Sequence, residues 1–196
     1  MKYAIIGAGG FGREVYHQMK HSVFGETDFY VDDEYATDKI KPMSSIDITT
    51  CKVLVAIGDP HKRQAVVSRL PENTEFFTFV HRSVIMPDDD IVIGEGSIIC
   101  AGAILTTNIK IGKHAQLNLQ TTIGHDCEIG DFFTTAPHVA ISGNCKIGDR
   151  VYFGTNSCVK EKISICDDVT IGLNAGVVKN IADPGTYIGT PCHKIK

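Results

Sequence analysis

Apolar residues recur at every sixth position through the second half of the chain. From residue 93 onward, fourteen of fifteen such positions are apolar and no gap is needed. They are Ile93, Ile99, Leu105, Ile111, Leu117, Ile123, Ile129, Thr135 (the polar exception), Ile141, Ile147, Phe153, Val159, Ile165, Ile171 and Val177. A period of six is neither that of a helix nor that of a plain strand. It predicts short strands separated by corners.

Three such units make one 18-residue coil with a triangular cross-section, so the run predicts a parallel β-helix of about 4.7 coils. An ordinary β-sandwich is the alternative, and it fits an unbroken period of six poorly. Glycine often follows the apolar residue, and we expect it to relieve the backbone at the corners. These glycines are Gly94, Gly112, Gly124, Gly130, Gly148, Gly154 and Gly172. Cys127, Cys145, Cys158 and Cys166 are expected to pack inside the coil.

The first half alternates between strand and helix patterns. Strands are expected at 3–6, 29–31, 53–58 and 76–80, and helices at 13–20 and 61–70. This alternation predicts an α/β unit with a parallel sheet. We therefore divide the chain into a small Rossmann-like α/β domain, residues 1–80, and a β-helix with a C-terminal tail, residues 81–196.

A glycine-rich loop follows the first expected strand. Residues 7–12 match the pattern GxGxxG, in which glycines let a phosphate approach backbone N–H groups at a helix N-terminus. A tight turn without a ligand is the alternative. Because a dinucleotide fold needs two halves and only one precedes the repeat, the loop favours a mononucleotide-linked substrate over NAD.

Composition narrows the function further. The formal net charge of −4 argues against nonspecific nucleic-acid binding. No apolar run is long enough for a membrane span, and the first residues do not resemble a signal peptide. The seven cysteines contain no CxxC pair, which is typical of reduced thiols. We expect a cytoplasmic protein that binds neither nucleic acid nor membrane.

Several motifs resemble those of one known family. They are residues 7–12, 31–33, 56–58 with Arg63, 124–127 and 189–191. The chain resembles the sialic-acid-type sugar O-acyltransferases, and it is more similar to the nucleotide-amino-sugar N-acetyltransferases of the bacillosamine and perosamine pathways. The resemblance covers essentially the whole chain. It implies a left-handed coil, a homotrimer with active sites between neighbouring coils, and acetyl-CoA as co-substrate. We expect no metal.

The resemblance implies that His125 is the general base and that Asp126 raises its basicity. Chemistry supports these roles, because an imidazole titrates near neutrality and a carboxylate fixes its tautomer. The period of six adds that His125 points outward near a corner. Gly143 is expected directly above it in the next coil, where it would leave room for a thioester and offer a backbone N–H to an oxyanion.

Substrate and cofactor residues are expected in two further groups. For the nucleotide sugar they are Gly9, Gly10, Phe11, Asp32, Asp33, Gly58 and His61. For acetyl-CoA they are Thr134, Gly143, Thr155 and Leu173. Thr155 and Leu173 stack with Pro137 on one edge by the 18-residue count. Relatives often carry histidine where this chain has Thr134, and glycine where it has His138.

Other interpretations of these residues stay open. His125 is alternatively a solvated surface histidine, Asp32 and Asp33 a solvated turn, and Arg63 a charge on a helix surface. His114, His125 and His138 are alternatively zinc ligands, although their spacings are not multiples of 18.

The sequence therefore predicts an acetyl-CoA-dependent N-acetyltransferase acting on the 4-amino group of a UDP- or dTDP-linked amino-deoxy sugar. O-acetylation of sialic acid or another sugar is one alternative. A nucleotide-binding scaffold without enzymatic activity is another.

Overall fold

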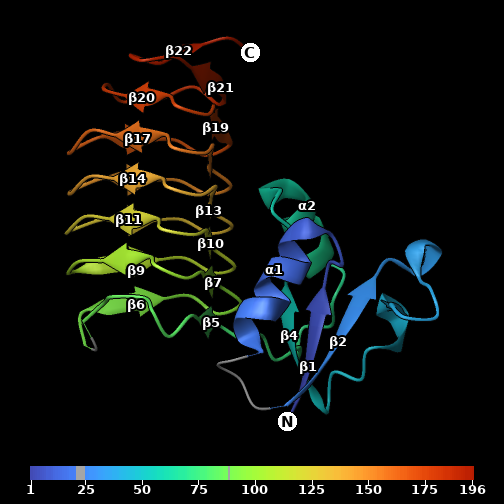
Figure 1. The fold of residues 1–196 in the computed structure, drawn as a ribbon. Coiled ribbons are helices and arrows are strands. Elements are labelled where there is room, and N and C mark those ends of the chain that lie inside the picture. Colours follow the sequence, from blue (N-terminus) through green and yellow to red (C-terminus); the bar gives the residue numbers. More distant parts are fainter. Residues whose placement is uncertain (21–24, 88) are drawn as a thin grey trace.

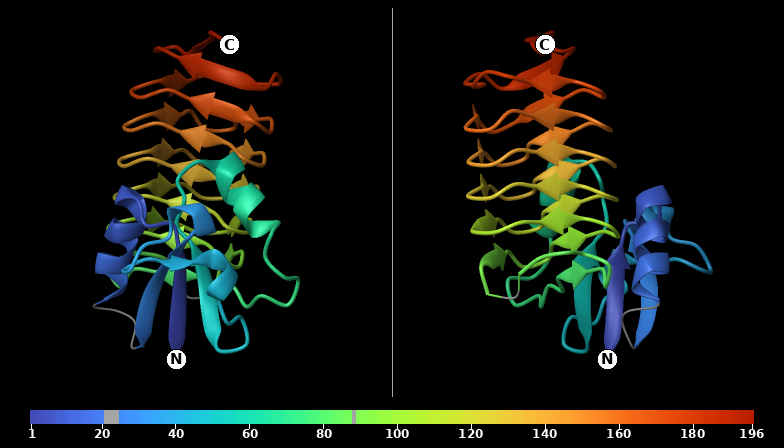
Figure 2. Two further views of the ribbon diagram at one scale, coloured as in Figure 1. Left: turned by 90° about the vertical axis from the view of Figure 1, so that its right-hand side faces the viewer. Right: turned by 60° about the vertical axis from the view of Figure 1, so that its left-hand side comes forward.

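The computed structural model describes residues 1–20, 25–87 and 89–196. A small α/β domain lies beside the N-terminal turns of a triangular coil, and the C-terminal turns extend beyond it (Figure 1). Figure 2 shows this arrangement from two further sides. The strands of the domain run along the long axis of the coil, with their carboxyl ends toward its C-terminal turns.

The α/β domain is built on a four-stranded parallel sheet in the order β3-β2-β1-β4. Its strands are β1 (Lys2–Ile6), β2 (Glu26–Val31), β3 (Lys41–Pro42) and β4 (Cys51–Val55). Its helices are α1 (Gly10–Met19) and α2 (Pro60–Val67), with short 3-10 helices η1 (Asp33–Tyr35) and η2 (Met43–Ser45). The predicted parallel sheet and both helices are confirmed. Among the described residues, no helix combines the length and apolar character that crossing a bilayer requires.

The strand expected at 76–80 is divided between the two parts of the molecule. Phe76 makes a single bridge to Val53 of β4, whereas β5 (Phe79–Val80) pairs with the first turn of the coil. The coil therefore begins before residue 81. Phe79 is fully buried where the two parts meet, in one cluster with Ile5 of the domain and Ile98 of the coil.

The coil has three faces made of parallel strands. The first face holds β5, β7 (Ile98–Ile99), β10 (Gln116–Leu117), β13 (Thr134–Thr135), β16 (Tyr152–Phe153), β19 (Val169–Ile171), β21 (Gly185–Ile188) and the antiparallel β22 (His193–Lys194). The second face holds β8 (Ile104–Leu105), β11 (Thr122–Ile123), β14 (Ala140–Ile141), β17 (Cys158–Val159) and β20 (Gly176–Val177). The third holds β6 (Ile91–Ile93), β9 (Ile109–Ile111), β12 (Glu128–Ile129), β15 (Lys146–Ile147) and β18 (Ser164–Ile165).

The predicted 18-residue register is confirmed on every face. Gln116 pairs with Thr134, Thr122 with Ala140, and Glu128 with Lys146. The apolar positions form one continuous core inside the prism. The polar exception, Thr135, is buried there and satisfied, because its Oγ1 lies 2.7 Å from Thr121 Oγ1.

Two of the four cysteines expected inside the coil are fully buried, namely Cys127 and Cys145. The expectation is wrong for Cys158, which is exposed, and only partly met for Cys166, which is half-buried. Cys158 occupies the outward position of β17, next to the inward Val159. The alternation of the strand therefore overrides the small size and apolar character of the side chain.

The corners of the coil are turned by left-handed residues. Every sixth residue from Asn108 to Asn174 has a φ between 51° and 62°. The members are Asn108, His114, Gln120, Asp126, Phe132, His138, Asn144, Arg150, Asn156, Lys162, Asp168 and Asn174. Asparagine and aspartate tolerate this conformation best, since their side chains hydrogen-bond locally. The expectation that glycine relieves the corners is wrong, because the seven glycines of the repeat do not take a positive φ.

Those glycines instead allow adjacent turns to stack closely. A Cβ at Gly130 would lie 2.7 Å from the carbonyl carbon of Gly148 in the next turn. A Cβ at Gly112 would meet Gly130 in the same way, at 2.6 Å. The repeated glycines therefore lie where the backbones of adjacent turns touch, two residues before the left-handed residue that turns each corner.

Arg63 joins the domain to the coil. Although α2 has a polar sequence, this side chain is fully buried, so the expected surface charge is wrong. Its guanidinium donates to the carbonyls of Ile57 (2.6 Å), His114 (2.9 Å) and Phe132 (2.7 Å), and to Thr134 Oγ1 (2.8 Å). Burial lowers the pKa of Arg63 to about 9, which leaves it charged at neutral pH.

The domain and the coil also share an apolar core. Ile98 and Cys100 of the coil belong to the same buried cluster as Ile5, Val15 and Leu54 of the domain. Two hydrogen bonds cross the boundary beside this cluster. Gln116 Nε2 donates to the Val55 carbonyl in a buried contact (2.9 Å), and the Ala101 N–H donates to Gln18 Oε1 in a partly buried one (2.8 Å). Together with Arg63, these contacts fix the domain against the first face.

His114 lies in the same junction, stacked on Phe132 with ring centroids 5.2 Å apart and edge-on to Phe76 at 4.6 Å. It is 3% exposed. Burial and the nearby Arg63 cation lower the pKa of His114 to about 4. The imidazole is therefore neutral throughout the physiological range.

This shift predicts an acid-sensitive junction. The unfolded chain binds a proton at His114 below about pH 6.5, whereas the folded protein does not until about pH 4, so stability falls as the pH drops between these values. We expect the wild type to lose about 2 kcal/mol more than His114→Asn between pH 7.5 and pH 5. Urea unfolding of both proteins at the two pH values measures this difference. Equal losses would contradict it.

Candidate active site

The loops after β1, β2 and β4 meet at one edge of the sheet, because parallel strands share the edge at which they end. The glycines there divide into two kinds. Gly7 and Gly12 are required by packing, since a Cβ on Gly12 would lie 1.9 Å from the Gly7 carbonyl oxygen. Gly9, Gly10 and Gly58 face open space, with no atom within 4 Å of an added Cβ. The open glycines leave backbone accessible to a ligand.

A cleft of about 300 Å³, here called the junction cleft, lies where this edge meets the coil. It is lined by Phe11 and Gly58 from the domain and by Gln116, Asn118, Thr134, Thr135, Ala136, Pro137, Tyr152 and Thr155 from the coil. The structure thus brings together four predicted residues: Phe11, Gly58, Thr134 and Thr155. Gln116 and Tyr152 were not predicted; both take the outward position of a first-face strand beside a buried partner.

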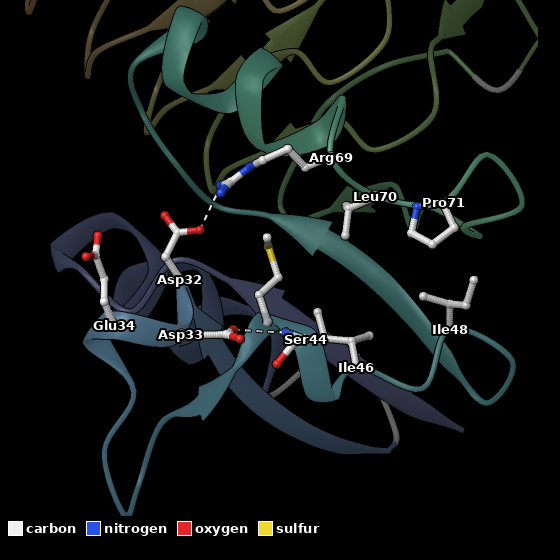
Figure 3. Close-up of a pocket in the computed structure, with 10 residues that line it drawn as sticks. Asp32, Asp33, Glu34, Ser44, Ile46, Ile48, Arg69, Leu70 and Pro71 are labelled. Carbon is white, nitrogen blue, oxygen red and sulfur yellow. Dashed lines mark hydrogen bonds and ion pairs between the residues drawn. The ribbon is translucent and has the colours of Figure 1, made fainter.

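A second cavity of about 610 Å³, the acidic cavity, follows β2 and β3 (Figure 3). Asp32 pairs with Arg69 (2.8 Å), and Asp33 accepts a hydrogen bond from the Ser44 N–H (3.1 Å). Hydrogen bonds from Ser44 hold the pKa of Asp33 below its usual range. Figure 3 shows the carboxylates at one end and apolar side chains, including Leu70, at the other. The cavity offers both a polar rim and an apolar wall.

His125 stands at the corner between the second and third faces, 57% exposed. Its Nδ1 lies 2.6 Å from Asp126 Oδ2, so the carboxylate reaches the imidazole. Hydrogen bonds from His125 and then Asn108 hold the pKa of Asp126 below its usual value. Because an ionised carboxylate only accepts hydrogen bonds, the proton of a neutral imidazole resides on Nδ1. Nε2 is left bare and able to accept a proton.

Gly143 lies against the imidazole, as the 18-residue count predicts. A Cβ there would be 2.7 Å from His125 Nε2. The expected room for a thioester is therefore filled by the ring itself. The Gly143 N–H has no acceptor in residues 1–20, 25–87 and 89–196, so its role toward an oxyanion stays a prediction.

Comparison with known proteins identifies the family. A family model described as the PglD N-terminal domain matches residues 2–70. A GDP-perosamine N-acetyltransferase of Escherichia coli O157:H7 is 31% identical over 156 residues, which cover 72% of this chain and 70% of that protein. The chain belongs to the family of nucleotide-amino-sugar N-acetyltransferases.

Solved structures of similar proteins share the architecture of this N-acetyltransferase. The acetyltransferase domain of PglB from Neisseria gonorrhoeae FA1090, in complex with acetyl coenzyme A, is 25% identical with a TM-score of 0.88, covering 99% of this chain and 98% of that one. WeeI from Acinetobacter baumannii AYE is 28% identical with a TM-score of 0.89, and all of both chains is covered.

The N-acetyltransferase does not bring its own His125 to its own junction cleft. Pro137 and Thr155 lie at the corner between the first and second faces, whereas His125 lies at the far side of the second face. A face of six residues spans at most roughly 20 Å. The cleft and the base therefore occupy two different edges of one chain.

Other predicted residues of the N-acetyltransferase are placed less centrally. Leu173 is 70% exposed and does not line the junction cleft, whereas Thr134 lines it but is buried and accepts a hydrogen bond from Arg63. His61 Nε2 lies 3.7 Å from Asp168 Oδ1, and His61 lines neither cavity described above. His114, His125 and His138 lie at three different corners. In the described part of the chain, no cluster of three or more His, Cys, Asp or Glu could hold a metal ion.

The two kinds of glycine should respond differently to a methyl group. Gly12→Ala forces a clash with backbone, and we expect it to cost roughly 3 kcal/mol or more. Gly10→Ala is the matched control in the same helix, and open space with better helix propensity should leave it unchanged or up to about 1 kcal/mol more stable. Chemical denaturation checks both. Similar destabilisation of the two variants would contradict the division.

Proposed function

We propose that this N-acetyltransferase moves the acetyl group of acetyl-CoA to the 4-amino group of an amino-deoxy sugar linked to a nucleoside diphosphate. The observation that carries the proposal is the dyad, in which Asp126 holds Nδ1 of His125 and leaves Nε2 bare. The open glycine edge and the junction cleft supply the place for the acceptor.

The sheet provides a path for such a substrate. The acidic cavity follows β2, the open glycines follow its neighbour β1, and Gly58 follows β4 at the junction cleft. The nucleoside occupies the acidic cavity and the sugar reaches the cleft. The diphosphate lies between them at the N-terminus of α1, whose first turn carries no acidic residue.

The reaction needs one proton transfer in each direction. The amine nitrogen attacks the thioester carbonyl carbon, so that a C–N bond forms and the C–S bond breaks. Nε2 of His125 takes the proton released by the nitrogen, and the imidazolium then returns a proton to the sulfur of CoA. Asp126 stabilises the imidazolium, as a carboxylate does in a catalytic triad. The products are an amide and a free thiol.

A homotrimer completes the site in this proposal. His125 of one chain faces the junction cleft of its neighbour, because base and cleft lie at opposite edges of the second face. The outward side chains of that face, among them Thr122, Ala140 and Cys158, are small enough for close approach between chains. CoA then runs along the Pro137, Thr155 and Leu173 edge of one chain, with its thioester beside the His125 ring and the Gly143 N–H of the neighbouring chain.

The sequence analysis predicts UDP or dTDP as the nucleotide. GDP is a third candidate, because the Escherichia coli relative is named for GDP-perosamine. All three present the same diphosphate to the glycine edge. A free sugar such as sialic acid has no phosphate to bind there, which favours N-acetylation of a nucleotide sugar over O-acetylation.

A thiol-release assay tests the function. The protein is incubated with acetyl-CoA and a panel of GDP-, UDP- and dTDP-linked 4-amino sugars, with sialic acid alongside. We expect release with at least one nucleotide sugar, and a fall in kcat of roughly 10²- to 10³-fold in His125→Ala with acetyl-CoA binding retained. His17→Ala removes an exposed histidine on α1 as the control and should behave as wild type. Release with sialic acid alone, or full activity of His125→Ala, would overturn the proposal.

A further inference from the structure

A chain of hydrogen bonds runs along the corner of the coil on which His125 stands. Asn108 Nδ2 donates to Asp126 Oδ1 (2.6 Å), and Asp126 Oδ2 lies 2.6 Å from His125 Nδ1. One turn further, the Asn108 N–H donates to Asp90 Oδ2 (2.8 Å). Asp90, Asn108 and Asp126 are each 18 residues apart, so the stacking register of the coil creates this chain.

Both oxygens of the Asp126 carboxylate are thereby engaged. One oxygen faces the imidazole and the other accepts the Asn108 amide, which leaves the carboxylate little freedom to rotate. Asn108 is itself held, because its left-handed backbone (φ 51°) is tied to Asp90 and the Thr107 hydroxyl donates to the same Asp90 oxygen. The amide is also a neutral donor. It therefore stabilises the ionised form of Asp126 without adding a second positive charge beside the His125–Asp126 pair.

We propose that Asn108 is a positioning residue for acetyl transfer. By donating to Oδ1, it holds Asp126 oriented toward Nδ1 of His125, and so keeps the proton of the neutral imidazole on Nδ1 and off the reactive Nε2. This inference rests on the proposed role of His125 as base. Asn108 touches neither substrate in this scheme; it acts through Asp126.

The alternative is that the pair only joins adjacent turns. Similar ladders occur at other corners, where Asn156 Nδ2 lies 2.7 Å from Asn174 Oδ1 and Arg150 Nε lies 2.7 Å from Asp168 Oδ1. A ladder of that kind contributes to stability and has no effect on the imidazole. The two accounts differ in what happens to kcat and to the tautomer of His125.

Two substitutions separate them. Asn108→Gly removes the amide and suits the left-handed backbone, so the fold is preserved. Asn108→Asp keeps the shape but places a second carboxylate against Asp126, which raises the pKa of Asp126 through like-charge repulsion. Gln120→Gly and Gln120→Glu are the matched controls, because Gln120 has the same left-handed conformation (φ 57°) at another corner.

We expect kcat to fall about tenfold in Asn108→Gly, as for one lost hydrogen bond to a charged group, and further in Asn108→Asp. The KM values for acetyl-CoA and the amino sugar should stay within about twofold, since only an interaction used in the transition state is lost. Both Asn108→Gly and Gln120→Gly should fold, with Asn108→Gly somewhat less stable because it gives up the hydrogen bond to Asp126. Unchanged kcat in both Asn108 variants would overturn the inference.

The imidazole tautomer gives a readout that does not require activity. ¹⁵N NMR of His125 at a pH where the ring is neutral should show Nδ1–H in the wild type and in both Gln120 variants, and a growing share of Nε2–H in the Asn108 variants. An unchanged tautomer in those variants would overturn the role of Asn108 even if His125 is the base. If the Asn108 variants show the tautomer shift but His125→Ala keeps full activity, the role of Asn108 in positioning the imidazole stands and the proposed function fails.

Discussion

The stacking of backbone at 18-residue intervals is the constraint on which the rest of the molecule depends. It favours glycine at positions such as Gly112 and Gly130, where a Cβ would meet the backbone of the next turn, and it sets left-handed residues at the corners from Asn108 to Asn174. The same register places Asn108 under Asp126, and Gly143 against the His125 ring. A pair on the edge of a stacked coil needs no loop to hold it, which suits the general base proposed here, since that base would have to meet two separate substrates.

The second constraint is the buried guanidinium of Arg63. A cation in this position is stable only because six acceptors on the domain and the coil surround it. Since one of these acceptors is the Ile57 carbonyl, beside the open Gly58, the same contact sets the distance from the edge of the sheet with the open glycines to the coil. In the function proposed above, the width of the junction cleft that this contact sets would limit which sugars enter it.

The sequence predicted what depends on periodicity. The parallel coil, its register, the outward His125 and its contact with Gly143 all follow from a period of six. It did not reveal that Arg63 is buried between the domain and the coil, because the sequence of a polar helix does not show which carbonyls a distant coil will present. It misplaced the bend by two residues, because glycine marks both strained turns and close backbone contact. It also treated residues 76–80 as one strand, because nothing local shows that Phe79 changes partner.

The central claim is that base and acceptor site come from neighbouring chains, and complementation tests it most directly. His125→Ala removes the base, and Gly58→Trp fills the junction cleft from a position where a side chain meets nothing. Each variant alone should be inactive. Co-expressed in equal amounts, they should recover about a quarter of wild-type activity, because in a cyclic trimer that share of sites pairs an intact base with an intact cleft. Mixed assemblies that stay as inactive as either variant alone would contradict the account.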